Sequence, residues 1–517
     1  MEERWNTVVV GGGSAGAVMA ARLSDDPERT VLLLEAGPDW RSTECPPELR
    51  NPYNKFAWLV GSIPEDYQWS SQTAARTTTR GAEPYLRGRG LGGTSLINGC
   101  VALRPPMAEF EDWEKAGCRG WGPDSVLPYF IRAENDHDFP GAEYHGDSGP
   151  IAVRREPREG WGTADRLLCE TALDAGHEWI DDANAPGGVG IGRIPSNIIG
   201  DARVTTNDGY LEPVRDRSNL RVQGNAFVDR VLVVDGRARG VRVRIGDSWT
   251  ELAADEVVVC AGAMATPGIL QRSGIGPAAL LNELGIPIVR DLPVGKGFQD
   301  HGSFALTATV FSAQPASNGI RGNVIIRFDS GHPDAGRGDL NISGLNAARS
   351  GTTDVVFLLK LGQCFSRGEY RISAVDPLAV PVVQENLLGD RRDVERGRTL
   401  LRVGLELLER ARRQGNADNI RGLDGTSLRS DLSDAELDSW AHRNVRDTAH
   451  ASSGCAMGDP ADRATVVDPE CRVLGVEALR VADASVMPTV TRSNTNIPTI
   501  MIAEKVAAMI QEGRKPL

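Results

Sequence analysis

A glycine pattern that directly follows a short apolar run constrains the fold of this chain more than any other feature. Residues 8–10 are β-branched and predict a buried strand, and Gly11, Gly13 and Gly16 follow in the spacing G-x-G-x-x-G. Residues 15–23 then form a plausible helix. In such a unit the first glycine makes a tight turn, the second lets a pyrophosphate approach the backbone, and the third lets the helix pack closely on the strand.

A second strand and an acidic residue complete the unit. Residues 30–34 predict the next strand and are followed by Glu35, 24 positions after Gly11, where dinucleotide-binding βαβ units carry an acidic residue. The diphosphate is expected at the helix N-terminus, and the Glu35 carboxylate is expected to accept hydrogen bonds from ribose hydroxyls. The sequence therefore predicts a Rossmann-like unit in an α/β protein.

The same residues are compatible with two other function classes. Residues 12–16 also match G-x-S-x-G, the nucleophile elbow of α/β-hydrolases, so a serine hydrolase with Ser14 as nucleophile is one alternative. That alternative leaves Glu35 and the third glycine unexplained. A nicotinamide-binding protein is the other alternative, because both kinds of dinucleotide place a ribose near Glu35.

Length, charge and cysteine usage set broader limits. A chain of 517 residues is long enough for two or three domains, and its net charge of −13 argues against nucleic acid as a partner. Its eight cysteines form no CxxC pair, and the spacing of histidines and cysteines indicates no metal site. We find no room for a signal peptide and no apolar stretch long enough to span a membrane. A cytoplasmic location is therefore expected.

The pattern along the chain suggests two domains. Residues 219–260 predict hairpin strands followed by a buried strand, and residues 391–413 and 497–513 predict amphipathic helices. We expect a Rossmann-like domain assembled from residues 1–150, 215–305 and 450–517. An inserted domain with a mixed or antiparallel sheet and helices is expected from residues 151–214 and 306–449.

Four further segments resemble the signatures of the glucose–methanol–choline (GMC) flavoprotein oxidoreductases. Residues 88–98 are similar to the first signature of that family, and residues 262–276 to the second. Residues 294–301 match its V-G-x-x-x-x-D-H, and residues 450–505 resemble its closing segment. The chain is identified as a member of this family, which implies FAD as the cofactor and makes the inserted domain the substrate-binding one.

The resemblance implies an FAD site built from several segments. The stretch 95–98 lacks the histidine that links the flavin covalently in some relatives, so non-covalent FAD is expected. The residues expected to contact FAD are Gly11, Gly13, Ser14, Ala15, Gly16, Glu35, Ala36, Arg87, Gly92, Gly93, Thr94, Ser95, Asn98, Gly99, Val228, Ala261, Asp483, Ala484, Asn496 and Thr499.

The resemblance also implies a catalytic pair. His450 corresponds to the catalytic histidine of the family, and Asn496 to its second partner, with Asn494 as the less favoured choice. His450 is expected to take the hydroxyl proton of an alcohol as hydride passes to flavin N5. His301 is expected to be structural. The family has Gly-Thr where this chain has Ser453-Gly454, which leaves the orientation of His450 open.

The substrate is expected to be a small-molecule alcohol, such as a sugar, aminosugar or other polyol, that becomes an aldehyde or ketone. An aryl or furanic alcohol is an alternative, as is a lyase or photodecarboxylase reaction of the kind that some relatives perform. The electron acceptor is expected to be O2, a quinone or another carrier.

Overall fold

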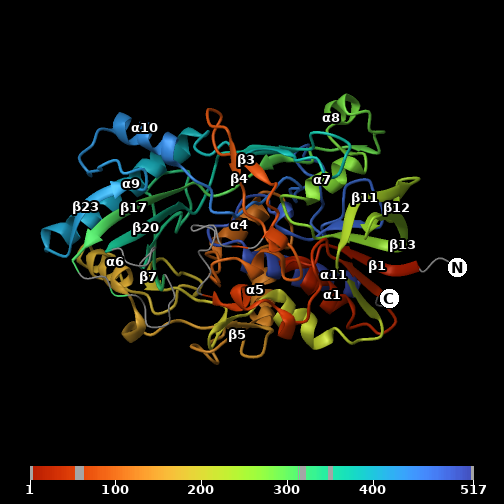
Figure 1. Ribbon diagram of the computed structural model, residues 1–517, viewed down its shortest axis with the longest axis horizontal. Coiled ribbons are helices and arrows are strands. Elements are labelled where there is room, and N and C mark those ends of the chain that lie inside the picture. Colours follow the sequence, from red (N-terminus) through yellow and green to blue (C-terminus); the bar gives the residue numbers. More distant parts are fainter. Residues whose placement is uncertain are drawn as a thin grey trace.

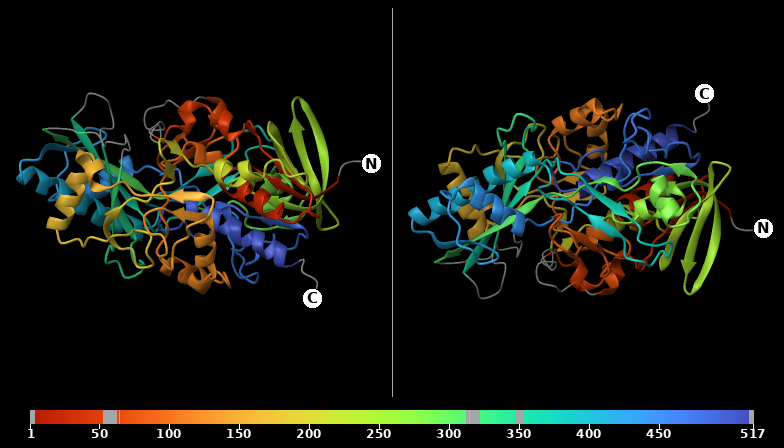
Figure 2. Two further views of the ribbon diagram at one scale, coloured as in Figure 1. Left: turned by 90° about the horizontal axis from the view of Figure 1, so that it is seen from below. Right: turned by 90° about the horizontal axis from the view of Figure 1, so that it is seen from above.

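The computed structural model describes residues 4–52, 63, 65–311, 314, 322–346 and 353–513. The molecule is elongated, with one large sheet toward each end of its long axis (Figure 1). Both termini lie at the end that carries β1 (Arg4–Val10), as the two further views also show (Figure 2). The six-stranded sheet lies toward the opposite end.

The first sheet has a parallel core. The strand β1 pairs in parallel with β2 (Val31–Leu34) on one side and with β13 (Ser248–Val259) on the other. The strand β10 (Leu220–Gln223) extends this sheet beyond β2, and β24 (Leu479–Val481) pairs with the end of β13. Its central strands are apolar on both faces, because helices and loops cover both faces of a parallel sheet.

An antiparallel hairpin and three helices complete this end of the molecule. The hairpin consists of β11 (Ala226–Val234) and β12 (Arg237–Ile245), and β12 pairs with β13. The helices α1 (Ser14–Leu23) and α11 (Asn496–Glu512) pack on each other, and α5 (Pro123–Ala133) packs on α11. Most of α11 is buried, and this explains why its sequence is apolar on more than one face.

The second sheet has six strands and is antiparallel throughout. Its strands follow the spatial order β23 (Ala417–Gly422), β17 (Ser303–Val310), β20 (Asp354–Leu361), β19 (Leu340–Leu345), β18 (Val324–Phe328) and β7 (Gly190–Arg193). The helices α6 (Thr163–Asp174) and α9 (Arg391–Arg413) pack on this sheet, and α10 (Asp434–Asn444) packs on α9. Alternate residues of β20, among them Phe357 and Leu359, are buried in the apolar core on the helix side.

Shorter elements connect the two large sheets. A five-stranded sheet contains β16 (Lys296–Phe298), β21 (Gly368–Arg371), β22 (Val382–Gln384), β3 (Thr73–Ala75) and β4 (Ala82–Pro84). The remaining strands are β5 (Glu134–Asp136), β6 (Ile151–Val153), β8 (Ile198–Ile199), β9 (Ala202–Arg203), β14 (Ile275–Gly276) and β15 (Arg290–Asp291). The remaining α-helices are α2 (Pro47–Arg50), α4 (Ala108–Lys115), α7 (Thr266–Arg272) and α8 (Ala278–Glu283).

The structure confirms the predicted α/β fold. The helices expected at residues 15–23, 391–413 and 497–513 correspond to α1, α9 and α11. The domain boundaries remain a prediction, and β17 begins at Ser303, within the segment assigned to the Rossmann-like domain. Across the described ranges, no helix is both long enough and apolar enough to cross a membrane.

Candidate active site

A cavity of about 460 Å³ lies where α1 and α11 begin. The residue before α1 is Gly13, and the residue before α11 is Thr495, and neither helix start is capped by a side chain. Ser14 Oγ donates a hydrogen bond of 2.7 Å to Asn496 Oδ1, which holds the two helix starts together. Two uncapped helix N-termini make this end of the cavity favourable for an anion such as a diphosphate.

The glycines of this region are required by close backbone approach. A Cβ atom on Gly16 would lie 1.7 Å from the Gly11 carbonyl oxygen, and one on Gly93 would lie 2.7 Å from the Gly13 Cα atom. The loop that carries Gly93 therefore lies directly on the turn before α1. No side chain fits between these backbones, so a ligand in the cavity can approach the backbone of the turn closely.

The Glu35 carboxylate binds backbone groups of this turn. It accepts hydrogen bonds from the backbone N–H groups of Gly12 at 2.7 Å, Gly37 at 2.8 Å and Gly90 at 3.0 Å. Glu35 also lines the cavity. It thus joins the end of β2 to the loop around Gly90, and its expected contact with a ribose remains a prediction.

The Asp483 carboxylate has an equivalent role on the other side of the cavity. It accepts from Gly262 N at 2.8 Å, from Thr266 Oγ1 at 2.6 Å and from Ser485 N at 2.8 Å. These bonds fix the start of α7 beside the segment that precedes α11. Burial raises the pKa of Asp483, and the hydrogen bonds lower it in part.

Most of the residues expected to contact FAD surround this one cavity. Those that line it are Gly11, Gly13, Ser14, Ala15, Glu35, Ala36, Arg87, Gly93, Thr94, Asn98, Gly99, Val228, Ala261, Asp483, Ala484, Asn496 and Thr499. Three others, Gly16, Gly92 and Ser95, are not part of the lining. Ser95 Oγ donates to the Gly92 carbonyl at 2.6 Å, so this pair shapes the loop behind the lining.

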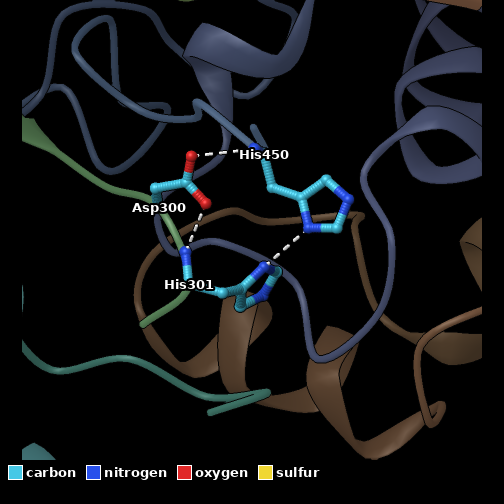
Figure 3. Close-up of side chains that lie close together, drawn as sticks. All are labelled: Asp300, His301 and His450. Carbon is cyan, nitrogen blue, oxygen red and sulfur yellow. Dashed lines mark hydrogen bonds between the residues drawn. The ribbon is translucent and has the colours of Figure 1, made fainter. Parts of the chain in front are cut away.

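His450 lies at the wall of the same cavity, with polar groups at both ring nitrogens. Its Nδ1 atom is 2.9 Å from His301 Nδ1 (Figure 3). The same Nδ1 atom is 2.7 Å from Thr448 Oγ1. Its Nε2 atom is 3.3 Å from Asn494 Nδ2. The structure therefore places Asn494 beside His450, whereas the Asn496 amide oxygen accepts from Ser14.

The hydrogen bonds around His450 determine which of its nitrogens carries the proton. His301 Nε2 lies 2.8 Å from the Thr491 carbonyl oxygen, which only accepts, so His301 carries its proton on Nε2. In neutral His301 the Nδ1 atom is then an acceptor, and His450 Nδ1 must donate to it. His450 Nε2 is left as the acceptor, and the Asn494 amide N–H donates to it at 3.3 Å. The tautomer thus follows from the network.

Thr448 and Asp300 support the same assignment. Thr448 Oγ1 donates to Asp300 Oδ1 at 3.1 Å, which leaves its lone pairs for the His450 Nδ1 proton. The Asp300 carboxylate also accepts from the backbone N–H groups of His301 at 2.6 Å and His450 at 2.8 Å (Figure 3). Tyr85 donates its hydroxyl proton to Asp300 as well. Asp300 therefore fixes the backbone of both histidines.

The electrostatic surroundings keep His450 neutral. Burial lowers the pKa of His450 well below its usual value, and the positive charge of Lys360 lowers it further. The pKa of His301 is lowered for the same two reasons. At neutral pH His450 is consequently an unprotonated base at Nε2.

The departure from the family motif lies in a turn beside His450. Ala449 and Ser453 have φ values of 57° and 64°, in the left-handed region that favours glycine. Ser453 Oγ donates to the Met487 carbonyl at 2.7 Å, a bond that glycine does not make. The serine side chain therefore ties this turn to the segment after β24.

Two groups of described residues present possible metal ligands within 4.8 Å of one another, namely Asp300, His301 and His450, and Glu134, Asp136 and His145. In both groups the ligand atoms already take part in hydrogen bonds or ion pairs within the protein. These internal partners account for both groups, and we assign no metal ion to either.

Comparison with known families identifies the chain. The N-terminal model of the GMC oxidoreductases matches residues 5–303, and their C-terminal model matches residues 364–503. The chain belongs to the GMC oxidoreductase family. The GMC oxidoreductases bind FAD, so this GMC oxidoreductase is a flavoenzyme that acts on CH–OH groups.

Individual relatives of this GMC oxidoreductase extend over its whole length. A 5-(hydroxymethyl)furfural oxidase of Methylovorus sp. is 36% identical, with 97% of this chain and 98% of the relative covered. An oxygen-dependent choline dehydrogenase of Pseudomonas savastanoi pv. phaseolicola is 34% identical, with 100% and 95% covered. Among solved structures, pyridoxine 4-oxidase from Mesorbium loti has a TM-score of 0.89 at 29% identity, with 98% and 99% covered.

The hydrolase and nicotinamide alternatives are not supported. Ser14 donates its hydroxyl proton to Asn496, whereas a nucleophilic serine would donate to a histidine base. The family assignment accounts for Glu35 and for all three glycines with FAD as the dinucleotide.

Some of the site residues have no sequence motif that could have identified them. Lys360 and Asn341 line the cavity from near the ends of ordinary strands. Thr448 is the exception, because its place two residues before His450 is a local signal for a contact with that side chain.

Proposed function

We propose that this enzyme oxidises an alcohol to an aldehyde or ketone, with His450 Nε2 as the general base. The observation that carries the proposal is the fixed tautomer of His450, whose Nδ1 proton is held by His301 and Thr448. A base must be unprotonated and within reach of the substrate hydroxyl, and the low pKa of His450 satisfies the first condition.

The residues present fit FAD. Two uncapped helix starts, and a turn in which Gly11 and Gly16 leave no room for a Cβ, form a cradle for the diphosphate. When bound, FAD supplies the acceptor for the hydride that leaves the carbinol carbon. The segment 88–99 contributes no histidine, cysteine or tyrosine to the cavity lining, which supports non-covalent binding.

The protein's own part in the reaction is to orient the alcohol and take up its proton. We propose Asn494, rather than Asn496, as the partner of His450, because the Asn494 amide lies 3.3 Å from His450 Nε2. The amide N–H donates to the substrate oxygen while Nε2 accepts the hydroxyl proton. The C–H bond breaks as the C=O bond forms. The imidazolium that results stabilises the negative charge on that oxygen.

The acceptor and the location are supported less directly. We propose O2 as the electron acceptor, because the names of two relatives describe oxidases and that of a third an oxygen-dependent enzyme. A cytoplasmic location is supported by the eight free cysteines.

A sugar or polyol remains our proposal for the substrate class, with an aryl or furanic alcohol as the alternative that the furfural oxidase favours.

An anaerobic spectrum tests the proposed reaction. The purified holoenzyme is titrated with a panel of polyols, sugars, aminosugars, aryl alcohols, hydroxy acids and choline, and the flavin absorbance is followed. Loss of the oxidised flavin band with one compound class supports alcohol oxidation, and rapid return of the band in air supports O2 as the acceptor. A flavin that no alcohol bleaches would refute the proposal.

A further inference from the structure

A row of nitrogen-bearing side chains crosses the cavity side of the six-stranded sheet. Lys360 on β20 is paired in register with Asn341 on β19 and with Ser303 on β17, and all three line the cavity. Arg327 on β18 is paired with Asn341 and continues the row. Residues in direct register share one face of a sheet, with Cβ atoms about 5 Å apart. The row therefore concentrates two positive charges and an amide at one place.

These side chains have hydrogen-bond donors to spare. Only 5% of Lys360 and 3% of Asn341 are exposed. Within the described structure, the Lys360 ammonium has neither a hydrogen-bond acceptor nor an ion-pair partner, and Asn341 Nδ2 has no partner either. Arg327 donates to the backbone carbonyls of Ala183, Gly188 and Arg104 and pairs with no carboxylate. A buried ammonium without a counter-ion is costly unless a ligand supplies the negative charge.

The row lies at the catalytic end of the cavity. Ser303 Oγ donates to the Arg446 carbonyl at 3.0 Å, so this strand end is joined to the segment that leads to His450. The Lys360 charge is close enough to lower the pKa of His450. Farther along the same face follow Leu358 and Ser343, paired in register, and then Leu345. The lining thus changes from donors near His450 to largely apolar side chains beyond it.

We propose that Lys360 and Asn341 bind a carboxylate carried by the substrate, so that the natural alcohol is a hydroxy acid with an apolar part. A carboxylate only accepts hydrogen bonds; the Lys360 ammonium offers only donors, and the Asn341 amide adds an N–H group without a partner in the described structure. A quaternary ammonium alcohol is disfavoured, because the cavity would bring two positive charges together. The inference rests on the proposed alcohol oxidation, and it specifies the substrate class for the same site.

The direct test is binding to the holoenzyme, which requires no turnover. Phenylacetate and phenylacetamide have nearly the same shape and differ in charge, and neither has a hydroxyl group to oxidise. We expect phenylacetate to bind about 10–100 times more tightly, as charge-assisted hydrogen bonds predict, measured by perturbation of the flavin spectrum and by calorimetry. Equal affinity for the two compounds would overturn the proposal. Equal affinity is also the expected result if Lys360 interacts only with the bound flavin.

Two variants locate the effect. Lys360→Met should remove most of the preference for phenylacetate, and Asn341→Ala should reduce it several-fold, while Lys115→Met, at a surface lysine on α4, should leave it unchanged. A preference that survives in Lys360→Met would overturn the assignment to this residue. The wild-type comparison does not depend on either variant folding.

The pH dependence gives a separate readout. Burial, with a contribution from Arg327, lowers the pKa of Lys360 to about 7, and the nearby Cys364 and Asp300 act in the opposite direction. His301 and His450 remain neutral in this range. Phenylacetate affinity should therefore fall as pH rises above about 7, and phenylacetamide affinity should not change. A phenylacetate affinity that does not depend on pH would contradict the proposal.

Turnover separates failure of this inference from failure of the proposed reaction. Mandelate should bleach the flavin with a higher kcat/KM than 1-phenylethane-1,2-diol, its neutral analogue, and with a higher kcat/KM than choline. Bleaching by the diol with no advantage for mandelate would refute carboxylate recognition and leave alcohol oxidation intact. Tight phenylacetate binding without bleaching by any alcohol would refute the reaction instead.

Discussion

The reactivity of His450 depends on contacts that reach its far nitrogen rather than the substrate. Thr448 and His301 both accept from His450 Nδ1, and Asp300 orients Thr448 and the backbone of both histidines. A histidine in water samples both tautomers, whereas this one presents Nε2 as the base. The protein thus holds His450 in its reactive tautomer before the substrate binds.

Removing the base should abolish most of the activity and leave the cofactor in place. We expect His450→Ala to slow anaerobic flavin reduction about 100- to 10,000-fold, the usual contribution of a general base. The bound flavin should keep its visible spectrum. His442→Ala, at an exposed histidine on α10, is the matched control. Near-normal reduction by His450→Ala would exclude it as the base.

The two asparagines near the start of α11 should have different roles. Asn494→Ala should lower the rate of flavin reduction about 10-fold or more, because the orienting donor is lost, with little effect on FAD affinity. Asn496→Ala should instead weaken FAD binding, because its side chain holds Ser14 at the diphosphate end. Stopped-flow reduction and FAD titration of the apoprotein measure the two effects. The reverse pattern would return the catalytic role to Asn496.

The low pKa of His450 makes a prediction for pH. Because its pKa is held well below the usual value by burial and by Lys360, His450 is already unprotonated at neutral pH. The rate of flavin reduction by a neutral alcohol should then stay nearly constant between about pH 8 and pH 5.5, whereas a histidine with the ordinary pKa of about 6.5 would lose about 90% of its unprotonated form over this range. Stopped-flow measurements over this range check the expectation. A rate that falls about tenfold would show that the pKa of His450 is not lowered.

At the level of secondary-structure elements, an ion cluster joins β5 to the loops after β6 and before β7. His145 lies between Glu134 on β5, with its Nδ1 atom 2.5 Å from Oε1, and Asp182, with its Nε2 atom 2.9 Å from Oδ2. Arg155 binds Asp136 at 2.8 Å and Asp182 at 2.7 Å in the same cluster. Burial by itself lowers the pKa of His145, but the hydrogen bonds that His145 donates to Asp182 and Glu134 raise it to about 9.

Breaking this cluster should destabilise the protein in a pH-dependent way. Since the folded-state pKa of His145 is raised, the stability it contributes is complete below about pH 6.5 and is lost as pH rises through about 9. At neutral pH, His145→Gln should reduce the free energy of unfolding by about 2–4 kcal/mol. Denaturant unfolding at two pH values checks this, with His442→Gln as the control. An equal loss at pH 7 and above pH 9 would contradict it.

On the scale of the whole molecule, one cavity is walled by segments from the beginning, middle and end of the chain. Gly11 follows β1, Ala261 follows β13, and Thr499 lies in α11. A ligand that fills this space contacts all of them at once. FAD is therefore expected to contribute to global stability and not only to catalysis.

Adding FAD to the apoprotein should raise its melting temperature. At a concentration 100 times Kd, the free energy of unfolding should increase by about 2.7 kcal/mol. The α11 segment and the six-stranded sheet should gain protection from hydrogen exchange together, because both border the cavity. Differential scanning calorimetry and exchange measurements test this. Protection confined to residues near β1 would show that the cofactor does not couple the two ends.

The sequence was most informative where signals are local. The turn at Gly11 and the helix α1 follow from neighbouring residues, and so does the 23-residue amphipathic helix α9. The choice between Asn494 and Asn496 depends on the direction in which each side chain points at the start of α11. The periodicity of the sequence does not predict that direction. In the sequence, Lys360 is simply one more residue of a strand. Only the assembled sheet of β17, β19 and β20 shows that no described side chain pairs with its ammonium group.

The order in which the ribosome makes these segments has a consequence for the cofactor. The glycine turn leaves the ribosome well before α11, whose start lies against it. At about 5–20 residues per second, the first half of the cradle waits roughly 25 to 100 seconds for the second half. During about the first half of that interval the strands β1 and β2 lack their neighbours β13 and β10, and throughout it FAD has no complete site to enter. Loading with flavin is therefore a post-translational event, and cells that overproduce this protein faster than they supply flavin should accumulate the empty form.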